Sequence, residues 1–359
     1  MVDERTVEAA LSAFVAAPAR MAGISALAGD ASTRRYYRVR MAPGAAMASL
    51  ILMEYPDDIP PGGELPFVNV HRYLRKAGVP VPEIHHAVPE ARLLFLEDAG
   101  DLMLEGAVAA AKGPDEFLPH YERCMEILVR IQWEGTRALD GNAMPARLAF
   151  DIPKFAEEID FFFEHAVREY GGVALPESEE RAIEDLFLPF LAQLAELPRV
   201  LAHRDYHSRN VMVAVPGRSG GKSDLRILDF QDARMGNVFY DLCSILRDSY
   251  VTLPEKVVDH LTYVYRHAAP ADLKRAGGDR AAFAYRLDVA ALQRNVKAIG
   301  TFGNQARNRG KTLYLRFIPP TVAHLAANFE RNPRMRPLAA RLLPILSHLA
   351  AKAAEEAPA

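Results

Sequence analysis

Cysteine is scarce in this chain, with only Cys124 and Cys243 among 359 residues. Each lies in an apolar, periodic segment, so the sequence does not support a disulfide framework or a cysteine-bound zinc site. A surplus of positive charge is also absent, because the formal net charge is −3. Binding to nucleic acid or to an anionic membrane surface needs such a surplus. We therefore expect neither partner, and a small molecule is the expected ligand.

Long uncharged apolar runs are missing as well. No stretch approaches the roughly 18 apolar residues that a membrane-spanning helix needs. The first residues, MVDERTVEAALSAF, place Asp3, Glu4 and Arg5 where a secretory signal would need an uninterrupted apolar core. These patterns predict a cytoplasmic protein. With 50% hydrophobic residues, the chain has enough apolar side chains to bury a sizeable core in two lobes.

The chain divides into two regions with different patterns. In the first region, alternating apolar residues separated by Gly- and Pro-rich turns predict short strands at 35–40, 49–53 and 92–97. A helix is expected at 66–78, because Pro66 suits a first helical turn and Gly78 a C-terminal stop. Helical periodicity dominates from about Asp115 onward. We expect an α+β fold with a strand-rich lobe at 1–97 and a mainly helical lobe at 98–359.

The segment HRDYHSRN, residues 203–210, gathers many polar groups between two apolar stretches. VMVAV (211–215) and LRIL (225–228) follow it and flank a polar turn, which predicts a β-hairpin. The second strand runs directly into Asp229. Antiparallel pairing of these strands would therefore return Asp229 to the neighbourhood of Asn210.

Asn210 and Asp229 together would offer an amide carbonyl and a carboxylate to a metal ion. Mg²⁺ accepts one or two such protein oxygens together with phosphate oxygens and water. Asp205, on the loop before Asn210, would be left to face a substrate hydroxyl. Zinc binding by His203 and His207 is disfavoured, since the usual helical H-E-x-x-H frame lacks its Glu. The alternative for Asp205 is that it caps the loop, and for Asn210 and Asp229 that they form ordinary turn and strand-end hydrogen bonds.

HRDYHSRN, the hairpin and ILDFQD together resemble the catalytic loop and metal-binding strand of protein-kinase-like enzymes. Because no A-P-E follows DFQD, the chain is more similar to small-molecule kinases of the aminoglycoside-phosphotransferase type. GDASTRRYYRV, PFVNVHRYLRKAGVPVPEI and LLFLEDAGD resemble the branch that phosphorylates the anomeric hydroxyl of N-acetylmuramate and N-acetylglucosamine in peptidoglycan recycling. The resemblance implies a two-lobe kinase fold, ATP and Mg²⁺, and an amino-sugar substrate.

In that family pattern, Asp205 would accept or orient the proton of the sugar hydroxyl, while Asn210 and Asp229 would hold Mg²⁺ on the phosphates. Residues 1–97 would bind the nucleotide and residues 98–359 the acceptor. Asp241 resembles a family position that orders the helix after the metal-binding strand, which is a structural role.

The nucleotide-binding lobe departs from the family pattern at one position. Met53 stands where kinases place a phosphate-binding Lys. Substitute phosphate contacts are expected from Ser32, Thr33, Arg34 and Arg35. A solvated edge strand is the alternative for the Arg pair. The segment joining the lobes is expected to read adenine through the backbone groups of Leu96, Glu97 and Asp98.

Acceptor recognition is the least determined part of the sequence. The candidate sugar contacts are His207, Arg209, Asp232, Asn304 and Arg307. Packing roles are the alternative for the first two, and solvated positions for the others. Two other functions stay open: phosphorylation of an aminoglycoside or other small alcohol, and a non-catalytic pseudokinase, which the missing Lys suggests. A monomer is the expectation that the resemblance gives.

Overall fold

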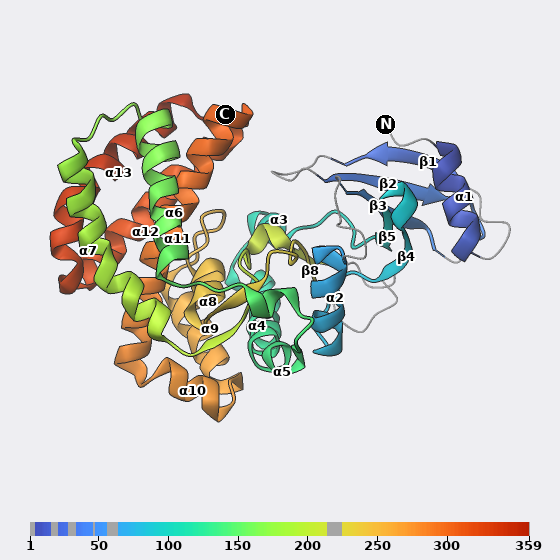
Figure 1. Cartoon of the computed structure of the whole chain (residues 1–359), viewed down its shortest axis with the longest axis horizontal. Coiled ribbons are helices and arrows are strands. Elements are labelled where there is room, and N and C mark those ends of the chain that lie inside the picture. Colours follow the sequence, from blue (N-terminus) through green and yellow to red (C-terminus); the bar gives the residue numbers. More distant parts are fainter. Residues whose placement is uncertain are drawn as a thin grey trace.

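The computed structural model describes residues 4–15, 21–27, 34–45, 47–55, 64–213 and 225–358. Two parts of unequal size make up the molecule (Figure 1). The smaller part carries a β-sheet and the N-terminus, and the larger part is a mainly helical body that carries the C-terminus. The expected α+β class is confirmed.

The sheet of the smaller part has five antiparallel strands in the order β1-β2-β3-β5-β4. The strands are β1 (Met21–Ala26), β2 (Arg35–Met41), β3 (Ser49–Glu54), β4 (Ile84–Val88) and β5 (Leu93–Glu97). Three of them confirm the predicted strands, whereas β1 and β4 were not predicted. Side chains alternate between the two faces of β5, because Phe95 packs in the cluster with Val7 and Leu11 while Leu94 packs in the main core.

Two helices cover the two faces of this sheet. Helix α1 (Glu4–Phe14) contributes Val7 and Leu11 to one face. Helix α2 (Pro66–Lys76) starts with proline in its first turn and packs its apolar side into the main core on the other face. Gly78 follows it with φ of +72°, a left-handed conformation that ends the helix as predicted.

The larger part is built around a long helix, α11, which other helices surround (Figure 1). Its helices are α3 (Leu104–Ala110), α4 (Pro114–Arg130), α5 (Thr136–Ala138), α6 (Ile152–Phe162), α7 (Glu177–Glu196), α8 (Phe239–Leu246), α9 (Glu255–Ala268), α10 (Ala271–Gly277), α11 (Arg280–Arg309), α12 (Ile318–Arg331) and α13 (Arg336–Glu356). Among the described residues, none of these helices is long and apolar enough to cross a membrane.

Two short β-pairs position the central loop of the larger part. Strand β6 (Arg199–Ala202) leads into the loop and pairs with β9 (Arg234–Asn237). Strand β7 (Val211–Val213) leaves the loop and pairs antiparallel with β8 (Leu225–Ile227). The backbone N–H of Leu228 donates to the carbonyl of Asn210 at 2.9 Å. This hydrogen bond brings Asp229, the next residue, to the loop. The antiparallel pairing of the predicted hairpin is confirmed, and its predicted polar turn lies outside the described residues.

Helix α11 sits unusually close to α6 and to the π-helical segment Phe163–Tyr170 that follows it. Two glycines make this approach possible. A Cβ on Gly303 would lie 2.6 Å from the carbonyl oxygen of His165, and one on Gly300 would lie 2.9 Å from the Cα of Phe162. The close contact fixes the register of α11, and Arg294 and Lys297 of this helix reach toward the loop at 203–210.

Candidate active site

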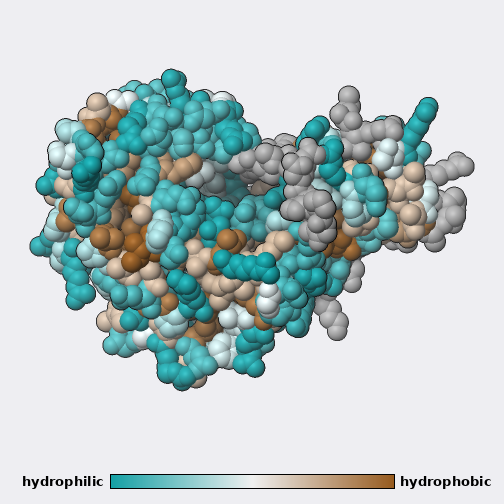
Figure 2. All heavy atoms as spheres, in the orientation of Figure 1, coloured by the Kyte–Doolittle hydropathy of each residue, from teal (hydrophilic) through white to brown (hydrophobic). Residues whose placement is uncertain are grey.

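A cavity of about 860 Å³ lies where the sheet-bearing part meets the helical body. Figure 2 shows the molecule hollowed at this junction, with mainly hydrophilic residues along the border. Arg34 and Leu96 line the cavity from the smaller part, and Asp205, Asp229 and Lys297 line it from the larger part. The cavity therefore joins the predicted nucleotide-binding segments to the predicted catalytic loop.

The backbone at the start of the loop is held by a buried carboxylate. Asp241, in the first turn of α8, accepts hydrogen bonds from the backbone N–H groups of His203 at 2.6 Å and Arg204 at 2.9 Å. Burial raises the pKa of Asp241 to about 7. Arg204 has φ of +85°, which the loop maintains only because its neighbours are fixed. Asp241 therefore anchors the loop, whereas the resemblance implied that it orders the helix after the metal-binding strand.

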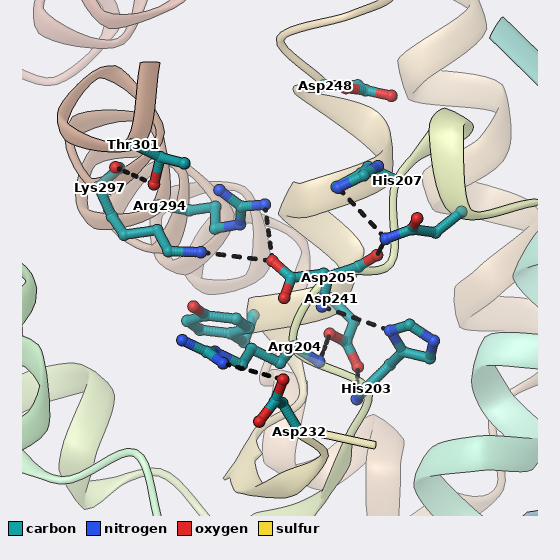
Figure 3. Close-up of polar contacts among 12 residues, drawn as sticks. His203, Arg204, Asp205, His207, Asp232, Asp241, Asp248, Arg294, Lys297 and Thr301 are labelled. Atoms are coloured by element: carbon teal, nitrogen blue, oxygen red, sulfur yellow. Dashed lines mark hydrogen bonds and ion pairs between the residues drawn. The ribbon is translucent and has the colours of Figure 1, made fainter. Parts of the chain in front are cut away.

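Asp205 faces two cations that come from α11 (Figure 3). Its Oδ1 lies 3.3 Å from the Nζ of Lys297 and 3.5 Å from an Nη of Arg294. Burial disfavours the charged carboxylate, but Lys297, Arg204 and Arg294 outweigh it and hold the pKa of Asp205 well below its ordinary value. The carboxylate is thus ionised at neutral pH and fixed in position.

Asn210 and Asp229 meet at the end of the hairpin, as the pairing predicted. The side-chain amide of Asn210 donates to the backbone carbonyl of Asp205 at 2.9 Å, which orients its own carbonyl oxygen. Asp229 has φ of +59°, and its Oδ1 accepts a hydrogen bond from Gln231 at 2.9 Å. Burial, and then the negative charge of Asp205, raise the pKa of Asp229 above its ordinary value.

This crowding of negative charge fits a divalent cation. Asp205, Asp229 and Asp232 all line the same cavity, so a cation there would relieve their mutual repulsion. Among the described residues, no three His, Cys, Asp or Glu side chains form a metal-binding cluster. The candidate ligands for Mg²⁺ are therefore one carboxylate and one amide oxygen, with phosphate oxygens and water to complete the shell.

The predicted phosphate contacts are only partly within the described structure. Ser32 and Thr33 lie outside the described residues. Arg34 lines the cavity, and an Nη lies 3.9 Å from the Oδ1 of Asp229. Arg35 points elsewhere: its side chain is 64% exposed and lies 3.4 Å from the carboxylate of Glu54. Of the Arg pair, only Arg34 is placed to reach a phosphate group bound near Asp229.

Side-chain contacts hold the segment that joins the two parts, residues 96–98, in place. Glu97 forms a buried ion pair with Arg226 of β8, with a shortest contact of 2.8 Å. The backbone N–H of Glu97 donates to the carbonyl of Glu83, so this N–H is already used. Asp98 accepts hydrogen bonds from Ser49 and Arg38. Leu96, Glu97 and Asp98 all line the cavity, which is where the sequence predicted an adenine site.

His207 and Arg209 are both held by packing within the loop. The ring of His207 packs edge-on against Tyr250, and burial lowers the pKa of His207 to about 3, so the ring is neutral. The guanidinium of Arg209 lies over Tyr250 and Tyr314 and is 3.3 Å from the carboxylate of Glu105. Both residues line the cavity while taking part in these contacts.

Asp232 lines the cavity and is half exposed, with its carboxylate 3.6 Å from the guanidinium of Arg204. Asn304 and Arg307 lie further along α11 and are not among the residues that line the cavity. The Oδ1 of Asn304 accepts a hydrogen bond from Asn308, whose amide also binds Glu169. The structure therefore brings Asp232 to the candidate site, and not Asn304 or Arg307.

Sequence reasoning missed the residues of α11 that do reach the cavity. Arg294, Lys297, Thr301 and Gln305 all line it, at spacings of three and four residues that place them on one side of the helix. The signal was present in QRNVKAIGTFGNQ, where two cations stand three residues apart in an otherwise apolar or small-residue helix. Asn304 lies seven residues after Lys297 and so has nearly the same helical phase, but it is not among the residues that line the cavity.

Sequence comparison relates the chain to known enzymes. The profile of a family described as the phosphotransferase enzyme family matches residues 23–277. Proteins named N-acetylmuramate/N-acetylglucosamine kinase are similar over most of the length. The one from Pseudomonas aeruginosa is 30% identical, covering 86% of this chain and 84% of the relative. The one from Neisseria meningitidis is 28% identical, covering 92% of both chains.

Solved structures share the fold at low sequence identity. Choline kinase LicA from Streptococcus pneumoniae superposes with a TM-score of 0.58 at 13% identity, covering 90% of this chain and 98% of that one. A microcompartment-associated aminopropanol kinase gives a TM-score of 0.56 at 17% identity, covering 96% of this chain and 100% of that one. The arrangement of sheet, joining segment and helical body is therefore that of small-molecule kinases.

Proposed function

This chain belongs to the phosphotransferase enzyme family, and from that premise we propose that it transfers the γ-phosphoryl group of ATP to the anomeric hydroxyl of N-acetylmuramate or N-acetylglucosamine. The names of its relatives support these two sugars as acceptors. The observation that carries the proposal is the ionised Asp205, fixed by Lys297 and Arg294 in a cavity that also contains Asn210 and Asp229.

In the proposed reaction, the sugar oxygen forms a bond to the γ-phosphorus, and the bond from that phosphorus to the β–γ bridging oxygen breaks. ADP leaves, and Asp205 accepts the proton of the hydroxyl. Asn210 and Asp229 would hold Mg²⁺, which when bound neutralises charge on the phosphate oxygens. A depressed pKa makes Asp205 a weak base, which suits a loose transition state in which positioning matters more than activation of the nucleophile.

The cations of α11 favour an acidic acceptor. Arg294, Lys297 and Arg309 line the cavity from this helix, while Asp229 and Asp232 line it from the segment after β8. A carboxylate-bearing sugar such as N-acetylmuramate would be attracted to the α11 side of the cavity, where a polycationic aminoglycoside would find no partner. The three polar residues of the proposed transfer site are all present, which favours an active kinase over a pseudokinase.

We further propose that the protein works as a monomer in the cytoplasm, where its phosphoryl donor is available. Both cysteines are free and buried, as suits a reducing compartment. Light scattering coupled to size-exclusion chromatography tests the monomer, and a dimer mass would contradict it.

The proposed activity can be tested directly by product analysis. The protein is incubated with Mg²⁺, ATP and one acceptor at a time: N-acetylmuramate, N-acetylglucosamine, glucose or an aminoglycoside. Phosphorus NMR then locates the new phosphate. We expect an anomeric sugar phosphate from one or both N-acetylated sugars. Phosphate on another hydroxyl, or turnover only with the aminoglycoside, would refute the proposed acceptor chemistry, and nucleotide binding without any turnover would favour the pseudokinase.

A further inference from the structure

We propose that Lys297 is a catalytic cation that contacts the transferring phosphoryl group and supplies, from the helical body, a positive charge that the strand of the smaller part lacks. Met53 is fully buried in β3, where kinases carry a Lys that binds phosphates. Arg34 is the cation of the smaller part that the structure places near Asp229. A positive charge close to both Asp205 and the transferring phosphoryl group would therefore come from another element. Lys297 of α11 lies beside Asp205 and can supply it.

The two carboxylate oxygens of Asp205 have different contacts. Lys297 and Arg294 both approach Oδ1 (Figure 3). Within the described part of the chain, no hydrogen bond or ion pair involves Oδ2. Oδ2 is thus available to take the proton of the acceptor hydroxyl. An oxygen that attacks phosphorus from this position brings the phosphoryl group close to the cations on Oδ1.

The two cations differ in what they can do. Arg294 also lines the cavity, but its side chain is the more buried of the two, 9% exposed, and an Nη lies 3.5 Å from the Oδ1 of Asp205, so its guanidinium holds the carboxylate. We assign it a positioning role. The side chain of Lys297 is 13% exposed and lines the cavity, and its ammonium group has three donors. One donor binds Asp205, which leaves others for an incoming phosphoryl oxygen.

The backbone around Lys297 keeps this ammonium in place. Thr301 donates a hydrogen bond to the carbonyl of Lys297 at 3.1 Å, and the close packing at Gly300 and Gly303 fixes the helix one turn further along. Pre-positioned charge costs no reorganisation when negative charge shifts onto the phosphoryl oxygens and the leaving ADP. Lys297 would therefore stabilise the transition state more than it stabilises bound ATP or sugar.

The test rests on the proposed function, and compares Lys297→Met, Lys297→Arg and the control Lys256→Met, an exposed lysine of α9. We expect Lys297→Met to lower kcat about 100- to 1,000-fold while the KM for ATP changes little, as for loss of one charge-stabilising donor. Lys297→Arg should recover part of the rate, and Lys256→Met should match the unmodified protein.

A binding measurement separates catalysis from structure. Affinity for ADP with aluminium fluoride, which mimics the transferring phosphoryl group, should fall in Lys297→Met, while affinity for ADP alone stays the same. Equal loss of both affinities, or kcat within a few-fold of the unmodified protein, would overturn the assignment. If Lys297→Met does not fold, the same two affinities, for ADP with aluminium fluoride and for ADP alone, are compared in Lys297→Gln and Lys297→Arg. Absence of turnover in the unmodified protein would instead count against the proposed function.

Discussion

The buried ion pair between Glu97 and Arg226 offers a sharp test of how the two parts of the molecule are joined. Each side chain is 7% exposed, and their contacts are 2.8 to 3.0 Å long. Arg226→Met would leave the charge of Glu97 buried without its partner. Breaking a buried pair in this way costs about 3–5 kcal/mol of unfolding free energy. We expect the lower end, because Glu97 keeps a hydrogen bond from the backbone N–H of Glu83.

Replacing both partners removes the unpaired charge. The double variant Glu97→Leu with Arg226→Met should therefore lose less than the sum of the single losses, by about 2 kcal/mol or more. Urea unfolding followed by tryptophan fluorescence and circular dichroism gives these values. Arg181→Met is the matched control, because Arg181 is 71% exposed and pairs with an exposed Glu177, so its loss should be within about 0.5 kcal/mol. Additive single losses, or an Arg226→Met loss below about 1 kcal/mol, would refute the reasoning.

Three further predictions concern the loop and the proposed metal ligands. Asp205→Asn should lower kcat about 100- to 10,000-fold while calorimetric affinity for Mg²⁺ and ATP stays within a few-fold; near-normal turnover would show that Asp205 is not the base. Excess EDTA should stop turnover and added Mg²⁺ restore it, and turnover that persists in EDTA would rule out the site at Asn210 and Asp229. Burial lowers the pKa of His203 to about 4 in the folded protein. As the pH falls below ~6.5, His203 is protonated in the unfolded chain but stays neutral in the folded protein, so the free energy of unfolding decreases. His203→Gln should remove on the order of 2 kcal/mol of the stability lost between pH 7.5 and 5 in urea unfolding, and an unchanged loss would contradict this.

The sequence predicted those parts of the fold whose pattern is local. Strands β2, β3 and β5 alternate apolar and polar residues or are continuously apolar, and α2 carries both of its end signals. Strand β1, with the sequence MAGISA, is rich in small residues of low strand propensity, and β4 contains two histidines. Both strands form because the neighbouring strands offer backbone partners, which is a tertiary effect that no short window of sequence contains.

In the candidate site, too, the residues linked by a local pattern could be predicted and those far apart in the sequence could not. Asp205, Asn210 and Asp229 could be placed together because they flank one hairpin. The contact between Asp205 and Lys297 joins residues 92 positions apart, and no local pattern predicts such a pairing. The residues on α11 that reach the cavity follow from helical phase only once one of them is known. Long-range charge pairing was thus the part that required the structure.

That separation along the chain also orders events during biosynthesis. Asp205 is made 92 residues before Lys297, a delay of roughly 5–18 s at typical translation rates. Until α11 emerges and packs its glycines against α6, the nascent chain carries Asp205 without the cations that lower its pKa. The proposed site is therefore completed late, when the helical body closes around its longest helix.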